Sequence, residues 1–213
     1  MTGSLGFVRH IALVGMMGSG KSEVGRELAR LLGCRFVDCD ELVAAQAGRS
    51  IPEIFAAEGE AGFRRRESET LAGVLAGDDA AVIATGGGVV TVASNRDLLA
   101  GTAVCWLCAR PEVLADRVGD GDGRPLLAPG AGESGTRGQG GDAIGAPAPG
   151  AGKSGVLERL RRLVADREPW YREVADIVVD VEDLSTGRAA RAVAARLGEL
   201  EGWLDGGPSE EAS

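Results

Sequence analysis

A glycine-rich segment constrains the fold of this chain more than any other feature. Residues 15–22 read GMMGSGKS and fit the pattern G-x-x-x-x-G-K-[ST]. The apolar run His10–Val14 precedes them, and apolar residues follow at helical spacing up to Gly33, which is placed to end a helix. Because strand, glycine loop and helix come in this order, we predict a loop that wraps around the phosphates of ATP or GTP.

Backbone and side chains have separate tasks in such a loop. Lys21 is expected to reach the outer phosphates, and the Ser22 hydroxyl to ligate Mg²⁺. A chance match is the alternative, since the chain contains 34 Gly, but the flanking strand and helix argue against it. We therefore predict nucleotide contacts along the whole loop: Gly15, Met16, Met17, Gly18, Ser19, Gly20, Lys21 and Ser22.

Length and charge narrow the class of protein. A chain of 213 residues suits one domain, and a net charge of −9 disfavours nucleic acid as a partner. The longest uncharged run, 80–95, is too short to span a membrane, and residues 1–9 lack the apolar core of a signal peptide. We expect a cytoplasmic protein without a membrane anchor, ending in an acidic tail at 199–213.

Apolar segments and helical patterns alternate along the chain. Ser50 and Glu53 have the spacing of a capping box, which predicts the start of a helix there. Alternating strands and helices predict a parallel sheet covered on both faces, with ligands at the carboxyl ends of the strands. The five predicted strands are His10–Val14, Arg35–Asp38, Ala81–Thr85, Thr102–Leu107 and Ile177–Val181.

The cysteines do not indicate a metal or redox site. Cys105 and Cys108 lie three residues apart in a predicted strand, where their side chains point to opposite faces. Cys34 and Cys39 flank another strand, and the chain has a single histidine. We interpret all four as ordinary thiols and expect no structural zinc.

Two carboxylates follow the second strand, at the edge where the glycine loop emerges. Asp38 and Asp40 share a face if the chain stays extended there. One could then hold Mg²⁺ through water while the other orients an acceptor hydroxyl or takes its proton. The alternative is that Asp40 merely caps a helix beginning at Glu41.

Two further features are open to two interpretations. Arg64, Arg65 and Arg66 lie on a predicted helix, where most such charges are simply solvated. The run 86–88 is three glycines after the third strand, which permits a ligand to approach the backbone closely but also suits a tight turn.

One segment has neither helical nor strand periodicity. Residues 128–155 contain ten Gly, six Ala and three Pro among 28 positions. Such a composition buries too little apolar surface to offset chain entropy, so we expect a flexible insertion.

Together these motifs resemble the shikimate kinase family over residues 10–197. The resemblance implies a three-layer α/β/α phosphate-loop kinase fold with a five-stranded parallel sheet, a mobile lid and a small helical substrate-binding region. It also implies ATP-dependent phosphorylation of the 3-hydroxyl of shikimate, in chorismate and aromatic amino acid biosynthesis. The matching residues, in order, are the loop 15–22, Phe36-x-Asp38-x-Asp40, Gly48-Arg49-Ser50-Ile51 with Ile54-Phe55, Glu58-Gly59-Glu60 with Phe63-Arg64, Gly86-Gly87-Gly88, Arg124-Pro125-Leu126-Leu127 and Arg167-x-Pro169-x-Tyr171.

The resemblance implies roles for the phosphate loop and the two carboxylates. Lys21 and Ser22 would handle the ATP phosphates and Mg²⁺, and Asp38 would help hold the metal through water. Asp40 would bind the substrate hydroxyls and serve as base. The implied partners are ATP and shikimate, with Mg²⁺ as cofactor, and we expect a monomer.

Further roles are implied for arginines and glycines. Arg64 and Arg167 would bind the substrate carboxylate, since planar guanidiniums pair bidentately with carboxylates. Arg124 would swing from a lid onto the transferring phosphate, and Arg117 would lie against adenine. The backbone of Gly86, Gly87 and Gly88 would line the acceptor pocket.

The implied organisation is one kinase domain over residues 1–198, followed by the tail. The substrate-binding region would span about 38–68 and the lid about 117–155, including the insertion. The segment 181–184 has no clear match to the family, so no adenine contact is predicted there. Two alternatives are a related kinase acting on gluconate or a cyclitol, and a non-catalytic nucleotide-binding homologue.

Overall fold

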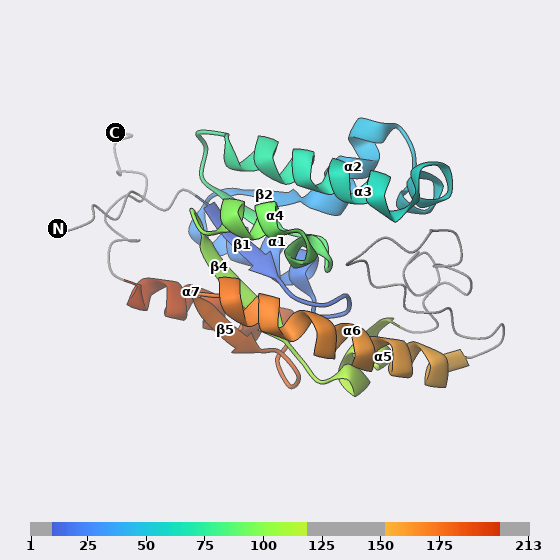
Figure 1. The fold of residues 1–213 in the computed structure, drawn as a ribbon. Helices are drawn as coiled ribbons and strands as arrows, with labels where there is room; N and C mark the ends of the chain where they lie inside the picture. The colour runs from blue at the N-terminus through green and yellow to red at the C-terminus, as the bar shows by residue number, and fades with distance from the viewer. Residues whose placement is uncertain (1–9, 119–151, 201–213) are drawn as a thin grey trace.

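The computed structural model describes residues 10–118 and 152–200 of the chain as an α/β fold (Figure 1). Five parallel strands form one sheet in the order β2-β3-β1-β4-β5. The elements are β1 His10–Val14, α1 Lys21–Leu32, β2 Arg35–Asp38, α2 Cys39–Ala47, α3 Ile51–Leu75, β3 Ala81–Ala84, the 3₁₀ turn η1 Val89–Thr91, α4 Ala93–Leu99, β4 Ala103–Cys108, α5 Pro111–Val118, α6 Gly152–Val174, β5 Ile177–Asp180 and α7 Thr186–Glu199.

The predicted α/β architecture and all five predicted strands are confirmed, with ends that differ by at most one residue. The three central strands, β1, β3 and β4, read as continuous apolar runs because both faces of the sheet are covered there. In β1, Ala12 and Val14 pack under α3, α4, α5 and α6. Ile11 and Leu13 face the other way, onto α1 and α7. This alternation buries every residue of β1 and leaves its carboxyl end for the glycine loop.

Local sequence signals place the helices that carry the site. Gly33 ends α1 in the left-handed conformation at φ 67°, as its position predicted. At the start of α3 the backbone N–H of Ser50 donates to Glu53 Oε2 at 2.8 Å, which confirms the capping box. Gly59 breaks α3 with φ 68° and ψ −176°, so the helix has two parts that meet at a kink.

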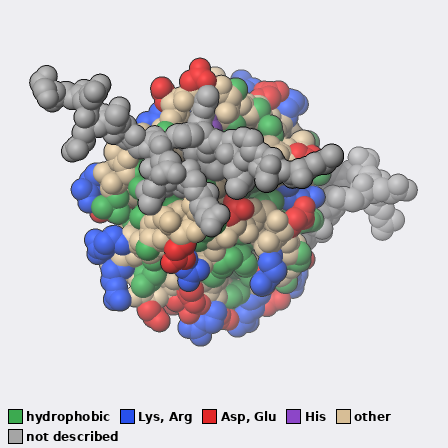
Figure 2. Space-filling model, turned by 90° about the vertical axis from the view of Figure 1, so that its left-hand side faces the viewer, with side chains coloured by type: hydrophobic (Ala, Val, Ile, Leu, Met, Phe, Trp, Pro, Cys, Tyr) green, Lys and Arg blue, Asp and Glu red, His purple; other side chains and the backbone are tan. Residues whose placement is uncertain are grey.

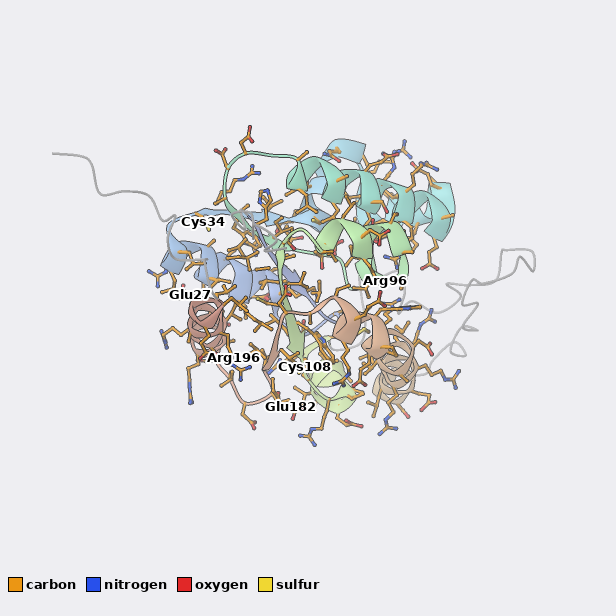
Figure 3. The ribbon with its side chains drawn as sticks, turned by 60° about the vertical axis from the view of Figure 1, so that its left-hand side comes forward. Glu27, Cys34, Arg96, Cys108, Glu182 and Arg196 are labelled. Carbon is orange, nitrogen blue, oxygen red and sulfur yellow. The ribbon has the colours of Figure 1, made fainter. Side chains whose placement is uncertain are left out.

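The side chains of Cys105 and Cys108 point to opposite faces of the sheet, as their spacing predicted. Cys105 faces the α1 and α7 layer, whereas Cys108 packs against the opposite layer. Figure 3 shows Cys34 and Cys108 on separate parts of the molecule. Burial raises the pKa of the Cys105 thiol to about 12, so this thiol stays protonated and unreactive at neutral pH.

One boundary prediction is wrong. Residues 152–155 belong to α6 instead of the predicted irregular insertion, because the helix extends one turn upstream of the apolar stripe that begins at Val156. Residues 119–151 of the predicted lid, including Arg124, and residues 201–213 of the predicted tail lie outside the described residues.

The described surface carries both signs of charge. Figure 2 shows acidic and basic side chains interspersed on one face of the molecule, with small apolar areas between them. Among the described helices, none combines the length and apolar character needed to cross a membrane.

Candidate functional site

A cavity of about 860 Å³ lies at the carboxyl ends of the strands. It is the place where the topology of a parallel sheet puts ligands. Its walls come from the glycine loop and start of α1, the β2–α2 junction, α3, the three glycines after β3, α5, and the segment after β5 with the start of α7. The polar lining includes Lys21, Ser22, Asp38, Asp40, Arg64, Glu67 and Arg117.

The glycine loop has the backbone geometry that its glycines permit. Gly15, Gly18 and Gly20 have φ values of 142°, 81° and 83°, which L side chains rarely adopt. A Cβ on Gly15 would come within 2.4 Å of Leu107 O, and one on Gly18 within 2.9 Å of Leu114 O. Only glycine therefore fits where the loop passes between β4 and α5.

Lys21 and Ser22 begin α1 and face the cavity. Lys21 Nζ donates to the carbonyls of Gly15 and Met16 at 2.8 and 2.9 Å, so the ammonium closes over the loop. The amide groups of the first turn of α1 add positive potential at the same place. Met17, Gly18 and Gly20 also line the cavity, whereas Met16 and Ser19 are buried beneath it.

The residues present fit a magnesium ion bound with nucleotide phosphates. Ser22 Oγ donates to Asp38 Oδ2 at 2.6 Å, which brings a hydroxyl and a carboxylate together beside the phosphate loop. Mg²⁺ prefers such oxygen ligands and keeps several waters, relying on substrate phosphates to complete its coordination. Within 10–118 and 152–200, no group of three or more His, Cys, Asp or Glu side chains could hold a metal by itself.

The chain turns into α2 directly after Asp38, so the condition under which Asp38 and Asp40 would share a face, an extended chain, is not met. Asp38 is the N-cap of α2, and its Oδ1 accepts from the backbone N–H groups of Asp40 and Glu41 at 3.0 and 3.3 Å. The alternative in which Asp40 caps this helix is therefore wrong, because α2 begins at Cys39. Asp40 instead lies in the first turn, with its side chain at the cavity.

Arg64 is less exposed than Arg65 and Arg66, its neighbours on α3. Its side chain is 11% exposed, against 64% for Arg65, and its Nη1 donates to Glu67 Oε2 at 2.7 Å. Burial lowers the pKa of Arg64, but the carboxylates of Glu67 and Glu60 more than offset this effect and leave that pKa raised. The guanidinium is therefore a permanent positive charge in the cavity wall.

The three glycines let charged side chains approach the backbone. A Cβ on Gly86 would lie 2.1 Å from Glu67 Oε1 and 3.0 Å from Asp40 Oδ1, and one on Gly88 would lie 2.2 Å from Arg64 Nη2. In this structure the groups close to the backbone are the protein's own side chains, and the approach of a ligand there stays a prediction. Glu67 itself was missed by sequence reasoning, although it follows Arg64 by one helical turn and is 1% exposed.

Arg167 does not line the cavity. It is buried behind the glycines, and its Nη1 donates to Gly87 O at 3.2 Å. Burial lowers the pKa of Arg167, and the nearby charge of Arg64 lowers it further. Two guanidiniums thus approach the glycine run, one at the cavity surface and one behind it.

The other end of the cavity includes residues that sequence reasoning left unassigned. Val181, Leu184, Ser185 and Thr186 line it, from the segment after β5. Arg117 Nη2 donates to the carbonyls of Val181 and Glu182 at 2.7 and 2.8 Å, which fixes this segment against α5. In Figure 3 Glu182 lies at this segment, where Arg110 Nε donates to its Oε2 at 2.8 Å. Little in the sequence indicates that these residues line a cavity, because they have no common charge and no periodic spacing.

Comparison with known proteins adds to this geometry. A family model described as shikimate kinase matches residues 17–198. The shikimate kinase of Halorhodospira halophila is 44% identical over 93% of this chain and 95% of its own length. That of Symbiobacterium thermophilum is 48% identical over 79% of this chain and 84% of its own.

Solved structures agree with the sequence comparison. Shikimate kinase from Acinetobacter baumannii, in complex with shikimate, superimposes with a TM-score of 0.75 at 33% identity and covers 91% of this chain and 95% of its own. A gluconokinase from Sinorhizobium meliloti, at 21% identity and a TM-score of 0.51, shares the fold alone. A family match over residues 17–198 and relatives that align along nearly their whole length mean that this chain belongs to the shikimate kinase family, a family of ATP-dependent kinases.

Proposed function

We propose that the protein transfers the γ-phosphoryl group of ATP to the 3-hydroxyl of shikimate, on the route to chorismate and the aromatic amino acids. The observation that carries this proposal is that residues suited to a nucleotide and residues suited to a small acceptor line the same cavity. The phosphate loop with Lys21 supports a nucleotide, while Asp40 and the buried Arg64 support a small acceptor that has hydroxyls and a carboxylate. In the reaction, the bond between the γ-phosphorus and the oxygen that bridges it to the β-phosphorus breaks. A new bond forms between the γ-phosphorus and the 3-oxygen of shikimate.

On the nucleotide side, Lys21 leaves the Gly15 and Met16 carbonyls to bind the outer phosphates. Ser22 would hold Mg²⁺ directly and Asp38 would hold it through water, and the chemistry that the metal would supply is neutralisation of charge on the leaving phosphate. Lys21 and the N–H groups of the loop stabilise charge that grows on the transferring group. Arg117 and the segment from Val181 to Thr186 form the base-binding end.

On the acceptor side, Asp40 accepts the proton of the 3-hydroxyl as the 3-oxygen attacks. Its place at the start of α2, next to Gly86, puts it at the carboxyl end of the sheet beside the phosphate loop. Arg64 pairs with the substrate carboxylate. Arg167 adds positive charge from behind Gly87, and the backbone of Gly86, Gly87 and Gly88 forms the floor.

We propose the predicted organisation, except that the irregular insertion ends where α6 begins at Gly152. Residues 1–198 form one kinase domain, the substrate-binding region spans about 38–68, and the lid spans about 117–155 and brings Arg124 to the phosphate. Lid closure excludes water, which would otherwise compete as acceptor. We also propose that the protein works as a cytoplasmic monomer.

A coupled assay of ADP release tests the proposed function. Purified protein with MgATP is given shikimate, gluconate or no acceptor. Turnover with shikimate alone supports the proposal. Turnover with gluconate alone, or with neither acceptor despite ATP binding, contradicts it.

A further inference from the structure

The Gly87 carbonyl is held by two buried side chains of α6. The Tyr171 hydroxyl donates to Gly87 O, and Arg167 Nη1 donates to the same oxygen at 3.2 Å. The two residues lie one helical turn apart, and their exposed fractions are 1% and 5%. A carbonyl with two donors on one side has a fixed orientation.

That orientation decides where the next backbone amide points. In a trans peptide unit the C=O and the following N–H point in opposite directions. Because Gly87 O points toward α6, the N–H of Gly88 points away from α6. Gly88 lines the cavity next to the Arg64 guanidinium, so this N–H is placed for an acceptor bound there.

Tyr171 also contacts the phosphate loop. Its hydroxyl oxygen lies 3.5 Å from Met16 Sδ, and its ring stacks on Trp106 with the centroids 5.7 Å apart. A Cβ on Gly87 would lie 3.3 Å from Met17 N and 3.5 Å from Gly15 O, so the backbones of the two loops are packed together. The hydroxyl therefore lies where the nucleotide loop and the acceptor loop meet.

We propose that Tyr171 is a positioning residue that ties Gly87 to the phosphate loop and thereby couples nucleotide binding to acceptor binding. The proposal rests on the proposed function, because it assumes that shikimate binds beside Gly88. A shift of the phosphate loop on nucleotide binding reaches Gly87 through the backbone contact and the shared tyrosine. By linkage, the acceptor then tightens the nucleotide by the same factor.

The chemistry of the phenol suits this role. Burial raises the pKa of Tyr171 to about 12, so the group remains a hydrogen-bond donor throughout the neutral range. The Trp106 ring fixes the phenol ring, which leaves the hydroxyl little freedom to choose another acceptor. Tyr171→Phe therefore removes the hydrogen bond to Gly87 O while it keeps the packing of the ring on Trp106.

The first test compares Tyr171→Phe with the wild type. The shikimate dissociation constant is measured by calorimetry with and without MgADP, and kcat and KM are measured by ADP release. We expect MgADP to tighten shikimate binding to the wild type. In Tyr171→Phe this tightening should fall about twofold to tenfold, the range for one lost hydrogen bond, with a matching rise in KM for shikimate.

Thr102→Val is the matched control, because it also removes one buried hydroxyl that donates to a backbone carbonyl, here Leu99 O at 2.8 Å. It should leave the coupling unchanged even if the melting temperature falls. Equal coupling in the wild type and Tyr171→Phe would overturn the proposal, as would a wild type in which MgADP does not affect shikimate binding. A wild type that does not phosphorylate shikimate would instead contradict the proposed function.

A second test leaves the fold intact. Tyr171 is the only tyrosine in the chain, so 3-fluorotyrosine incorporation gives a protein with one fluorine resonance. We expect this resonance to shift when MgADP binds, and to shift again when shikimate is added. A resonance that stays fixed with both ligands bound would contradict a coupling role.

Discussion

Ser22 Oγ donates a hydrogen bond to Asp38 Oδ2 at 2.6 Å, which joins the start of α1 to the end of β2. Replacing Ser22 by Ala removes a proposed metal ligand and leaves Asp38 without this donor. We expect kcat/KM for MgATP to fall about tenfold to a hundredfold, the equivalent of about 1.5–3 kcal/mol. The measurement is the initial rate as a function of Mg²⁺ concentration, and excess Mg²⁺ should restore part of the activity.

Ser68→Ala is the control for Ser22→Ala. Ser68 Oγ donates to Arg64 O within α3 at 2.9 Å, so this hydroxyl makes only a contact within its own helix. Its loss should not change the dependence of the rate on Mg²⁺. A Ser22→Ala enzyme with the same Mg²⁺ dependence as the wild type would refute the proposed metal site.

The contrast between Arg64 and Arg65 tests the carboxylate contact. Arg64→Ala should raise KM for shikimate about tenfold to over a hundredfold, because a charge-assisted contact is worth about 1.5–3 kcal/mol. Arg65→Ala, one position along and largely exposed, should change KM little. Arg167→Ala should act in the same direction as Arg64→Ala. Normal shikimate kinetics in both the Arg64 and Arg167 variants would rule out a role for these two guanidiniums in binding the substrate carboxylate.

Arg64→Ala also leaves the buried Glu67 carboxylate without its ion-pair partner. Some of its effect on activity could therefore come from lost stability. The double variant Arg64→Ala with Glu67→Gln removes that unpaired charge. We expect it to melt closer to the wild type while KM for shikimate stays raised, which separates folding from binding.

Because side chains lie close to the backbone of the three glycines, adding a methyl group there should reduce shikimate turnover without preventing ATP binding. In Gly86→Ala the added Cβ would meet Glu67 Oε1 at 2.1 Å and Asp40 Oδ1 at 3.0 Å, so both acceptor-side carboxylates must move. We expect shikimate turnover to fall at least tenfold while ATP binding persists. Gly73→Ala on α3 meets nothing within 4 Å and should raise the free energy of unfolding by about 0.5–1 kcal/mol. Full activity in Gly86→Ala would contradict the described pocket.

The buried phenol predicts a loss of stability in alkali. The unfolded chain releases the tyrosine proton near a pH of about 10, and the folded protein holds it until about 12. Between these values the unfolded state binds fewer protons, so the free energy of unfolding falls as pH rises. The contribution is complete below the lower value, and about 2–3 kcal/mol is lost across the interval. Denaturant titrations should show this slope in the wild type and a shallower one in Tyr171→Phe, and equal slopes would contradict it.

Much of the fold was predictable because each strand is a short apolar run bounded by glycine or polar residues. His10–Val14 ends where predicted because every one of its residues is buried. Arg35–Asp38 also ends where predicted, although it is an edge strand in which Arg35 is exposed and the other three residues are partly buried. The start of α6 was not predictable to the same precision. Residues 152–155 include two glycines and a serine, and local propensity gives no reason to extend a helix through them.

The site was predictable where residue type alone sets the chemistry, as in the phosphate loop. Prediction failed where the local backbone conformation determines which way a side chain points. Whether Asp38 or Asp40 caps α2 depends on a shift of two residues in the start of the helix, and the structure selects Asp38. Glu67 lies in a run of charged residues, and only the tertiary fold shows that it faces inward while Arg65 faces solvent.

Phosphorus and proton nuclear magnetic resonance of the product formed from MgATP and shikimate shows which hydroxyl receives the phosphoryl group. We expect one phosphate ester, whose phosphorus couples to the proton on carbon 3 of the ring, together with an equal amount of ADP. An ester at another hydroxyl, or free phosphate as the only phosphorus product besides ADP, would contradict this expectation.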